Sequence, residues 1–339
     1  MPDYTQFLKV LLRQERPDYL PFYEHIASSG FVSRRMGVDI DTLGWGSEAF
    51  WKTYVDFWMG MGFDCVPLEI GFDMPLGRGE AGLSRGSEST VMIRSREDYE
   101  KYPWPDESSP IDFGQFEIVS SLLPDGAKIV GGVGGGPYEW CSMLLGTVGM
   151  SYLLADDPEL VEMVFARVGG LHISADRQLA TMDSICALRQ GDDLGFKTST
   201  FLSPELLRKL VFPTYTAMVE HAHSHGKPFI LHSCGNLAEV YDDLIDDCKI
   251  DGKHSFEDAI MPVSEFKRQY GDRVTALGGL DVDVICRAGE AELRRYVRKC
   301  VEECFSDGYW ALGTGNSLTD YMPVENYMMA LEEGRAVAG

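Results

Sequence analysis

Short β-rich runs alternate with longer amphipathic segments along almost the whole chain of 339 residues. The runs expected as strands cover residues 20–25, 63–70, 128–134, 185–192, 228–234, 250–255, 273–280 and 308–313. Helical patterns lie between most of them, including residues 47–60, 144–154, 158–179, 204–225, 237–248 and 290–305. About eight β-α units with strands this short favour an α/β fold of the closed (β/α)8 type, the TIM barrel, over an open doubly wound sheet.

Two segments depart from an ideal barrel. Residues 1–14 are expected to form a helix ahead of the first strand. Residues 73–124 are too long for one βα unit and hold a glycine-rich patch, an expected strand at 90–95 and a proline-rich loop. We interpret this stretch as an inserted hairpin and lid near the barrel mouth, because long ordered loops are usually functional. Since no linker or repeat interrupts the pattern, residues 1–339 are expected to form a single domain.

The charge balance narrows the range of partners. Lysine and arginine number 30 against 53 aspartates and glutamates, which gives a net charge of −23. Such a surface repels phosphate backbones and anionic membranes, so neither nucleic acid nor a membrane is an expected partner. A secretory leader is not apparent, and the eight scattered cysteines lack the rhythm of a disulfide scaffold, which fits the cytoplasm. The sequence leaves open whether copies associate into a homo-oligomer.

Polar side chains gather at the C-terminal ends of the expected strands, whereas the strand starts are mainly apolar. In a (β/α)8 barrel those C-terminal ends form the mouth at which reactive groups lie. The residues concerned are Glu24, His25, Glu69, Tyr138, Glu139, Asp192, Asp193, His232, Cys234, His254, Glu257, Asp281, Asp283, Thr314 and Asn316. This one-sided distribution indicates an enzyme.

One strand end carries a candidate metal-ligand pair. The run KPFILHSCGN, residues 227–236, is apolar until it reaches His232 and Cys234. Residues two apart at a strand end project to the same side. Neutral imidazole and thiolate are ligands that zinc prefers. The alternative is a core strand that ends in a buried thiol and a hydrogen-bonded histidine.

Other motifs are weaker. The tract HAHSH at residues 221–225 ends a helix, which places it at the structural end of the barrel. The glycine run at 132–137 does not complete G-x-G-x-x-G, because Pro137 occupies its last position, and its glycines instead permit close approach of a ligand or another backbone. Asp192 and Asp193 either cap a turn or act at the mouth, where the pair shares a proton or binds a substrate hydroxyl.

Five ordered segments resemble the uroporphyrinogen decarboxylase superfamily, which also contains cobalamin-dependent methyltransferases. They are QGDDLGFKTSTFLSPELL (190–207), FILHSCGNLAEVYDDLID (229–246), DGKHSFED (251–258), ALGGLDVDVI (276–285) and ALGTGNSLTDYMPVENY (311–327). The resemblance covers most of the chain and implies a (β/α)8 barrel, in agreement with the strand pattern.

Differences within the resemblance favour its methyltransferase branch. True decarboxylases carry an arginine-rich N-terminal signature for the porphyrinogen carboxylates, whereas residues 17–31 here contain no arginine. They also carry Gly-His-Gly on the last strand, where this chain has Gly313-Thr314-Gly315. An acidic mouth would serve a tetra-anionic substrate poorly. Two alternatives remain: a decarboxylase that acts on a carboxylated substrate through Asp192 or Asp193, and a non-catalytic metal-binding barrel.

The resemblance also implies a zinc site. The methyltransferase branch holds zinc with a His-x-Cys pair on the fifth strand and a further cysteine on the last strand. His232 and Cys234 match the pair, but the third position falls on Thr314, so the third ligand is expected from Glu69 or His254. The implied reaction moves a methyl group from a methoxylated or methylated small molecule to the cobalt of a corrinoid carried by a separate protein, with zinc assisting.

Roles for the remaining mouth residues follow from that reaction. Those expected to be catalytic, as proton donors or orienting groups, are Asp192, Asp193 and His254. Those expected to bind substrate are Glu24, Glu69, Tyr138 and Asn316. Tyr138, Trp140 and Phe72 are candidates for the walls of an apolar slot that takes an aromatic ring.

Overall fold

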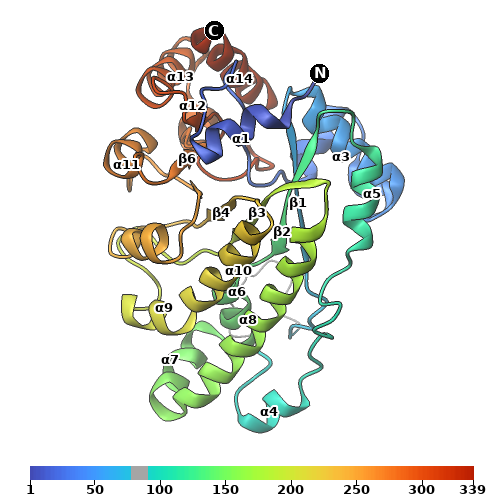
Figure 1. Cartoon of the computed structure of the whole chain (residues 1–339), viewed down its shortest axis with the longest axis vertical. Helices are drawn as coiled ribbons and strands as arrows, with labels where there is room; N and C mark the ends of the chain where they lie inside the picture. The colour runs from blue at the N-terminus through green and yellow to red at the C-terminus, as the bar shows by residue number, and fades with distance from the viewer. Residues whose placement is uncertain (78–90) are drawn as a thin grey trace.

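Seven parallel strands form one sheet in which each strand pairs with the next along the chain. The computed structural model describes residues 1–77 and 91–339 (Figure 1). The strands are β1 (Cys65–Gly71), β2 (Lys128–Gly134), β3 (Ile185–Gly191), β4 (Phe229–His232), β5 (Gly252–His254), β6 (Thr275–Leu277) and β7 (Trp310–Ala311). Each of the seven runs expected as barrel strands from residue 63 onward therefore overlaps an observed strand, although β4 to β7 are shorter than expected.

The segment expected as the first strand, residues 20–25, lies beside β7. It forms a parallel bridge between Phe22 and Leu312 rather than a regular strand. The amide of Tyr23 donates to the carbonyl of Leu312, and the amide of Leu312 donates to the carbonyl of Pro21, both at 2.9 Å. The Tyr23 side chain shares a buried apolar cluster with Cys65 of β1. The curled sheet thus brings its two edges together, and the barrel fold class is confirmed.

Helix α1 (Tyr4–Leu12) lies across one end of this sheet (Figure 1). Its residues Phe7, Val10 and Leu11 pack against inward-facing residues of the strands, in an apolar cluster separate from the main core. The hydroxyl of Thr275 donates to the carbonyls of Val10 and Leu11 at 3.1 and 3.3 Å. The helix predicted ahead of the first strand is confirmed. Because it covers the N-terminal end of the barrel, only the opposite end is left for a mouth.

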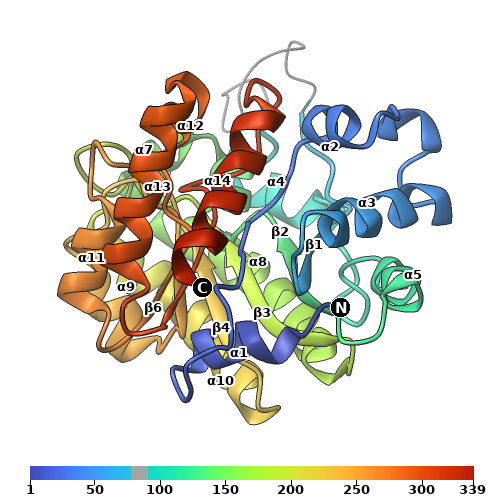
Figure 2. The same cartoon turned by 90° about the horizontal axis from the view of Figure 1, so that it is seen from above.

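The other helices surround the sheet (Figure 2). Their apolar faces complete the main core, which contains residues from almost every element. They are α2 (Ser29–Met36), the 3-10 turn η1 (Ile40–Leu43), α3 (Glu48–Gly60), α4 (Arg96–Lys101), α5 (Gly114–Leu122), α6 (Pro137–Leu145), α7 (Thr147–Asp156), α8 (Pro158–Thr181), α9 (Pro204–Leu210), α10 (Phe212–Ser224), the π-helical turn η3 (Asp243–Asp247), α11 (Val263–Tyr270), α12 (Val282–Arg287), α13 (Glu290–Cys304) and α14 (Val324–Ala338). Within residues 1–77 and 91–339, none of the helices combines the length and apolar character needed to cross a membrane.

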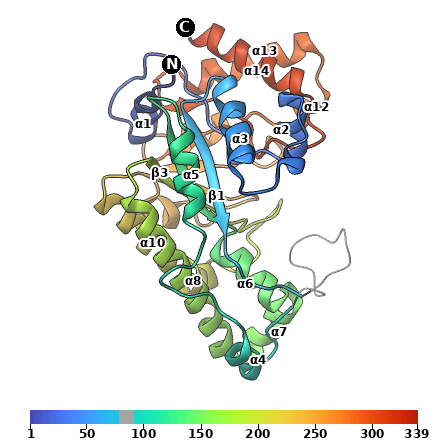
Figure 3. The same ribbon diagram turned by 90° about the vertical axis from the view of Figure 1, so that its right-hand side faces the viewer.

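The insertion after β1 runs alongside α8 (Figure 3). The strand expected at 90–95 is wrong for residues 91–95, which form no strand; the amides of Met92 and Ile93 instead donate to the carbonyl of Leu144 at the end of α6. Helix α4 follows, and its Arg96 pairs with Asp157 at the start of α8, at 2.6 Å. Most of the glycine-rich part of the expected hairpin falls on residues 78–90, outside the described residues.

Helix α8 carries a buried carboxyl group. Asp176 is fully buried, and neither of its carboxyl oxygens has a hydrogen-bond partner among the described residues. Burial raises the pKa of Asp176 well above its usual value. The folded protein therefore keeps a proton that the unfolded chain releases above about pH 4. The stability that this protonated carboxyl contributes at low pH is lost progressively as the pH rises.

We predict that Asp176→Asn raises the free energy of unfolding at pH 7 by about 1 kcal/mol or more, and by less at pH 5. The reason is that each unit by which burial raises the pKa corresponds to about 1.4 kcal/mol between the two protonation states. Urea unfolding at both pH values measures the effect. Asp156→Asn, at the exposed end of α7, is the control and should change neither value. A loss of stability at pH 7 in Asp176→Asn would contradict the prediction.

Candidate functional site

Three potential metal ligands meet at the ends of β3 and β4. The ligand atoms of Asp193, His232 and Cys234 all lie within 4.8 Å of one another. His232 Nε2 is 3.6 Å from Cys234 Sγ and 3.7 Å from Asp193 Oδ1. The amide of Cys234 also donates to Asp193 Oδ1 at 2.9 Å, which holds the carboxylate against the end of β4. We call Asp193, His232 and Cys234 the metal group.

Strand geometry explains why these side chains meet. Side chains alternate between the two faces of a strand, so residues two apart share a face. Glu69, Arg189 and His232 occupy inward positions of β1, β3 and β4, because neighbouring residues in each of these strands belong to the outer core. His254 of β5 is paired with His232 in the parallel register and therefore lies on the same face. A glycine is required at residue 235, where φ is +90° and a Cβ atom would stand 2.1 Å from the backbone of Gly195. This close approach presses the loop after β3 against the loop after β4.

The hydrogen bonds of the two central histidines fix their tautomers. His254 Nε2 lies 2.9 Å from the carbonyl oxygen of Thr314, which can only accept, so Nε2 carries the proton. In a neutral His254, Nδ1 is then the acceptor for Nδ1 of His232, at 2.7 Å. His232 therefore donates through Nδ1 and leaves Nε2 without a proton. That lone pair faces Cys234 and Asp193, as metal ligation requires.

Burial keeps these imidazoles neutral. It lowers the pKa of His254 to about 3, although the bond to the carbonyl of Thr314 opposes the shift. It also lowers the pKa of His232 to well below its usual range, with the neighbouring His254 adding to the effect. Burial and the Asp193 charge raise the pKa of the Cys234 thiol to about 12. Without a cation, the group therefore holds a neutral imidazole and a protonated thiol.

The metal group suits zinc. The unprotonated Nε2 of His232 lies 3.7 Å from Asp193 Oδ1. Both atoms carry lone pairs, so a cation bound between them would stabilise this arrangement. Zinc bonds of about 2.0 to 2.3 Å at tetrahedral angles place neighbouring ligand atoms about 3.3 to 3.6 Å apart, close to the separations found here. Imidazole, thiolate and carboxylate are all zinc ligands, and three protein ligands with one open position are typical of catalytic sites.

The expected third ligands lie elsewhere. His254 has both ring nitrogens engaged, with Thr314 and His232. Glu69 lies 3.2 Å from Arg189 and 3.5 Å from His25, and it does not belong to the metal group. Asp193, expected as a catalytic residue, is instead the third member of the metal group. Alternation explains the result, because Asp193 follows inward-facing Gly191 by two positions, whereas nothing in the sequence indicated which of the two aspartates faces inward.

Glu24 and Thr314 form a buried support behind the metal group. The carboxylate of Glu24 accepts from the Thr314 amide at 2.6 Å, from its hydroxyl at 2.7 Å and from Tyr327 at 3.0 Å. Burial raises the pKa of Glu24 to about 8, against these three bonds. Glu24 is only 1% exposed, so its position does not support the expected contact with substrate. It instead orients Thr314, whose carbonyl accepts a hydrogen bond from Nε2 of His254.

Asp192 binds the start of helix α6 rather than facing the metal group. Its carboxylate accepts from the amides of Tyr138 and Glu139 at 3.0 and 2.9 Å, and from the Tyr215 hydroxyl at 2.6 Å. Burial raises its pKa to about 7 although all three bonds favour the charged form. A carboxylate at a helix N-terminus is a structural arrangement. The expected catalytic role of Asp192 is therefore not supported by its position.

The remaining expected residues divide between two places. Asn316 donates its amide to Cys234 Sγ at 3.3 Å, next to the metal group. Ser255 Oγ lies 3.5 Å from the same sulfur, a contact that no sequence motif indicated. Tyr138, in α6, is 5% exposed and stacks on Phe201 of the loop after β3, with ring centroids 5.8 Å apart.

An ion-paired cluster lies beside the metal group. Arg189 is fully buried and donates to His25 Nδ1 at 3.0 Å, so the His25 proton is on Nε2, 3.5 Å from Glu69. The His25 ring stacks on His232 with centroids 3.8 Å apart and 12° between planes. Sequence analysis missed Arg189, because an arginine in an apolar strand gives no hint that its charge is matched across the barrel.

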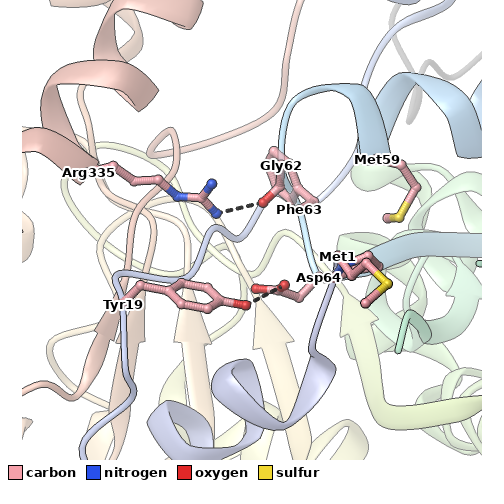
Figure 4. Close-up of a pocket in the computed structure, with 8 residues that line it drawn as sticks. Met1, Tyr19, Met59, Gly62, Phe63, Asp64 and Arg335 are labelled. Carbon is pink, nitrogen blue, oxygen red and sulfur yellow. Dashed lines mark hydrogen bonds between the residues drawn. The ribbon is translucent and has the colours of Figure 1, made fainter. Parts of the chain in front are cut away.

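Two other polar places have structural explanations. The histidines at 221–225 lie at the end of α10, where His223 pairs with Asp251 at 2.7 Å, as the motif position predicted. A hollow of about 460 Å³ lies next to the chain start (Figure 4). Its polar residues bond to the protein itself: Tyr19 donates to Asp64 at 2.7 Å, and Arg335 donates to the carbonyl of Gly62 at 2.7 Å.

The fold and mouth define a barrel with its polar residues at the strand ends. The family model for uroporphyrinogen decarboxylase (URO-D) matches residues 65–337. The chain belongs to the uroporphyrinogen decarboxylase family, a family of enzymes. Among curated proteins, no sequence matches this chain.

Solved structures are similar to this fold. A methyltransferase from Methanosarcina mazei has a TM-score of 0.70 and 16% identity, with 98% of this chain and 97% of that chain covered. A protein assigned as a vitamin-B12 independent methionine synthase from Listeria monocytogenes has a TM-score of 0.48 and 14% identity over 96% and 98% of the two chains. An endo-beta-1,4-xylanase from Gloeophyllum trabeum has a TM-score of 0.44 and 14% identity over 67% and 81%. Identities this low show likeness of fold alone.

The approach of Asp192 to helix α6 yields a stability test. A Cβ atom on Gly136 would stand 2.1 Å from the Asp192 side chain, so we predict that Gly136→Ala lowers the free energy of unfolding by about 1 to 3 kcal/mol. Gly170→Ala is the matched control, because a Cβ atom at this position in α8 meets nothing within 4 Å. We expect it to raise the free energy of unfolding by up to about 1 kcal/mol, since alanine favours the helix more than glycine does. Chemical unfolding measures both. Equal effects of the two substitutions would contradict the geometry.

Proposed function

We propose that this protein is a methyltransferase that moves a methyl group from a methoxylated or methylated small molecule to a corrinoid carried by a separate protein. The observation that carries the proposal is the metal group, with the unprotonated Nε2 of His232 facing Cys234 at 3.6 Å and Asp193 at 3.7 Å. Family membership and the likeness of fold to a methyltransferase support it.

Asp193, His232 and Cys234 would hold zinc, which supplies Lewis-acid stabilisation for the negative charge that develops on the departing heteroatom. The rest of the site positions these ligands. His254 donates a hydrogen bond from Nε2 to the carbonyl of Thr314 and accepts one at Nδ1 from His232. These two hydrogen bonds keep the His232 imidazole in the tautomer that can bind a metal. Asn316 directs its amide at the sulfur, where it stabilises negative charge on Cys234.

The loop after β3 offers a contact surface for a protein partner. Phe196 and Phe201 follow Asp193 in this loop and are 45% and 48% exposed. Their backbone amides donate to Ser199 and Leu194 at 2.9 and 2.8 Å, so the loop keeps its shape. Exposed apolar side chains beside a reactive centre are typical of interaction sites. They support docking of a corrinoid protein at this side of the mouth.

Decarboxylation through Asp192 is less well supported. Its carboxylate already accepts three hydrogen bonds within the protein. Asp192 would therefore have to give up its hydrogen bonds to the start of α6 in order to reach a substrate. Asp193 belongs to the metal group and faces His232.

Methyl transfer can be measured directly. The purified protein is mixed with a reduced corrinoid protein and a panel of methyl donors, and the methyl-cobalt absorbance change is followed. We expect at least one donor to give that change, and expect His232→Ala and Cys234→Ala to reduce the rate by at least about 100-fold with loss of bound zinc. His223→Ala and Cys286→Ala, outside the metal group, are the matched controls. Full activity in His232→Ala and Cys234→Ala would refute the proposal.

The hydrogen bond from His232 to His254 is expected to strengthen metal binding. His254→Phe keeps a ring in place but removes the acceptor for His232 Nδ1, so we expect zinc to bind about 10- to 100-fold more weakly. Competition with a zinc chelator measures the affinity. His172→Phe is the control: His172 is equally buried in α8, and its nitrogens face the carbonyls of Val168 and Gly135 instead. Unchanged zinc affinity in His254→Phe would contradict the relay.

A further inference from the structure

A cavity of about 540 Å³ opens at the ends of β1 and β2. This volume is within the range of roughly 300 to 1,000 Å³ that small-molecule pockets have. Six of its described lining residues are aromatic: Trp45, Phe50, Trp51, Tyr54, Phe72 and Trp140. Phe72 and Trp140 were expected to line an aromatic slot, whereas Tyr138 is not among the lining residues.

The polar atoms of three of these aromatic side chains, Trp51, Tyr54 and Trp140, are engaged within the protein. Trp51 Nε1 donates to Gln115 at 2.6 Å, the Tyr54 hydroxyl donates to the carbonyl of Pro67 at 2.9 Å, and Trp140 Nε1 donates to the carbonyl of Gly134 at 3.0 Å. The rings therefore offer carbon surface to the cavity rather than hydrogen-bond donors. A flat apolar molecule gains most from such walls.

Charge around the cavity disfavours ions of either sign. Glu69 lines it, and among the described lining residues there is no lysine or arginine. A ligand carboxylate would lose its hydration here and meet Glu69 without a basic partner. A ligand cation would find Glu69 already paired with Arg189, 3.2 Å away. An uncharged ligand avoids both costs.

The cavity adjoins the metal group through one imidazole. Glu69 in the cavity wall lies 3.5 Å from His25 Nε2, and the His25 ring stacks directly on His232. The cavity wall is thus linked to the metal ligand His232 through Glu69 and the His25 ring. We propose that this cavity binds an uncharged aromatic molecule, with its ring among Trp45, Trp51 and Trp140. This binding does not rest on the proposed function.

Binding is tested on the full chain without any corrinoid protein, by calorimetry and by the fluorescence of the cavity tryptophans. The probes are 2-methoxyphenol, its carboxylated relative 4-hydroxy-3-methoxybenzoate, and tetramethylammonium. We expect saturable binding of 2-methoxyphenol and at least about tenfold weaker binding of the two ions. Trp45→Ala should weaken 2-methoxyphenol about tenfold, because an aromatic contact is lost from a side chain that is 65% exposed and not needed for folding. Tyr152→Ala, 69% exposed on α7, is the control and should leave binding unchanged.

Glu69→Gln separates charge from shape. Removal of the negative charge beside Arg189 should reduce the difference in affinity between 4-hydroxy-3-methoxybenzoate and 2-methoxyphenol. The affinity for 2-methoxyphenol itself should stay within a few-fold of that of the unchanged protein. Absence of 2-methoxyphenol binding, tighter binding of either ion, or indifference to Trp45→Ala would overturn the inference. If binding follows the expected pattern and no methyl group is transferred, the proposed function fails and the cavity assignment stands.

Discussion

Burial of two neighbouring imidazoles controls the rest of the candidate site. His232 and His254 lie on adjacent strands, paired directly opposite each other in the register of β4 and β5. Their desolvation keeps them neutral, and a neutral pair has one N–H on each ring to place. The carbonyl of Thr314 accepts a hydrogen bond from Nε2 of His254, so Nδ1 of His254 accepts from Nδ1 of His232. Nε2 of His232 is therefore left without a proton. The site therefore presents a lone pair to Asp193 and Cys234 before any ligand arrives.

The N-terminal end of the barrel is closed, and a buried ion pair lies beside the histidines. Helix α1 fills the N-terminal end with Phe7, Val10 and Leu11, so water is kept from the inner face of the strands below the histidines. Beside the histidines, Arg189 brings a permanent charge into the interior, and Glu69 matches it at 3.2 Å. Glu69 also lines the aromatic cavity and lies 3.5 Å from His25, whose ring stacks on His232.

The departure of this chain from the cysteine-rich zinc site that the resemblance implied has a structural explanation. Thr314 stands where the third cysteine was expected, and its hydroxyl points to Glu24 rather than to the metal group. Asp193, a carboxylate at the end of the neighbouring strand, belongs to the metal group instead and is held by the amide of Cys234. In the proposed zinc site, an oxygen ligand in place of a thiolate would make the metal centre harder and less electron-rich.

The sequence by itself determined the barrel class, the N-terminal helix, the segments that contain the strands, and the pair of His232 and Cys234, because periodicity and the two-residue repeat of a strand are local properties. Tertiary structure alone decided that Asp193 faces the metal group while Asp192 caps α6, that Glu24 is buried under Thr314, and that six aromatic residues enclose a cavity. It also decided that residues 20–25 form a bridge and that residues 91–95 form no strand. These outcomes depend on strand register and on contacts between residues far apart in the chain, neither of which leaves a trace in local composition.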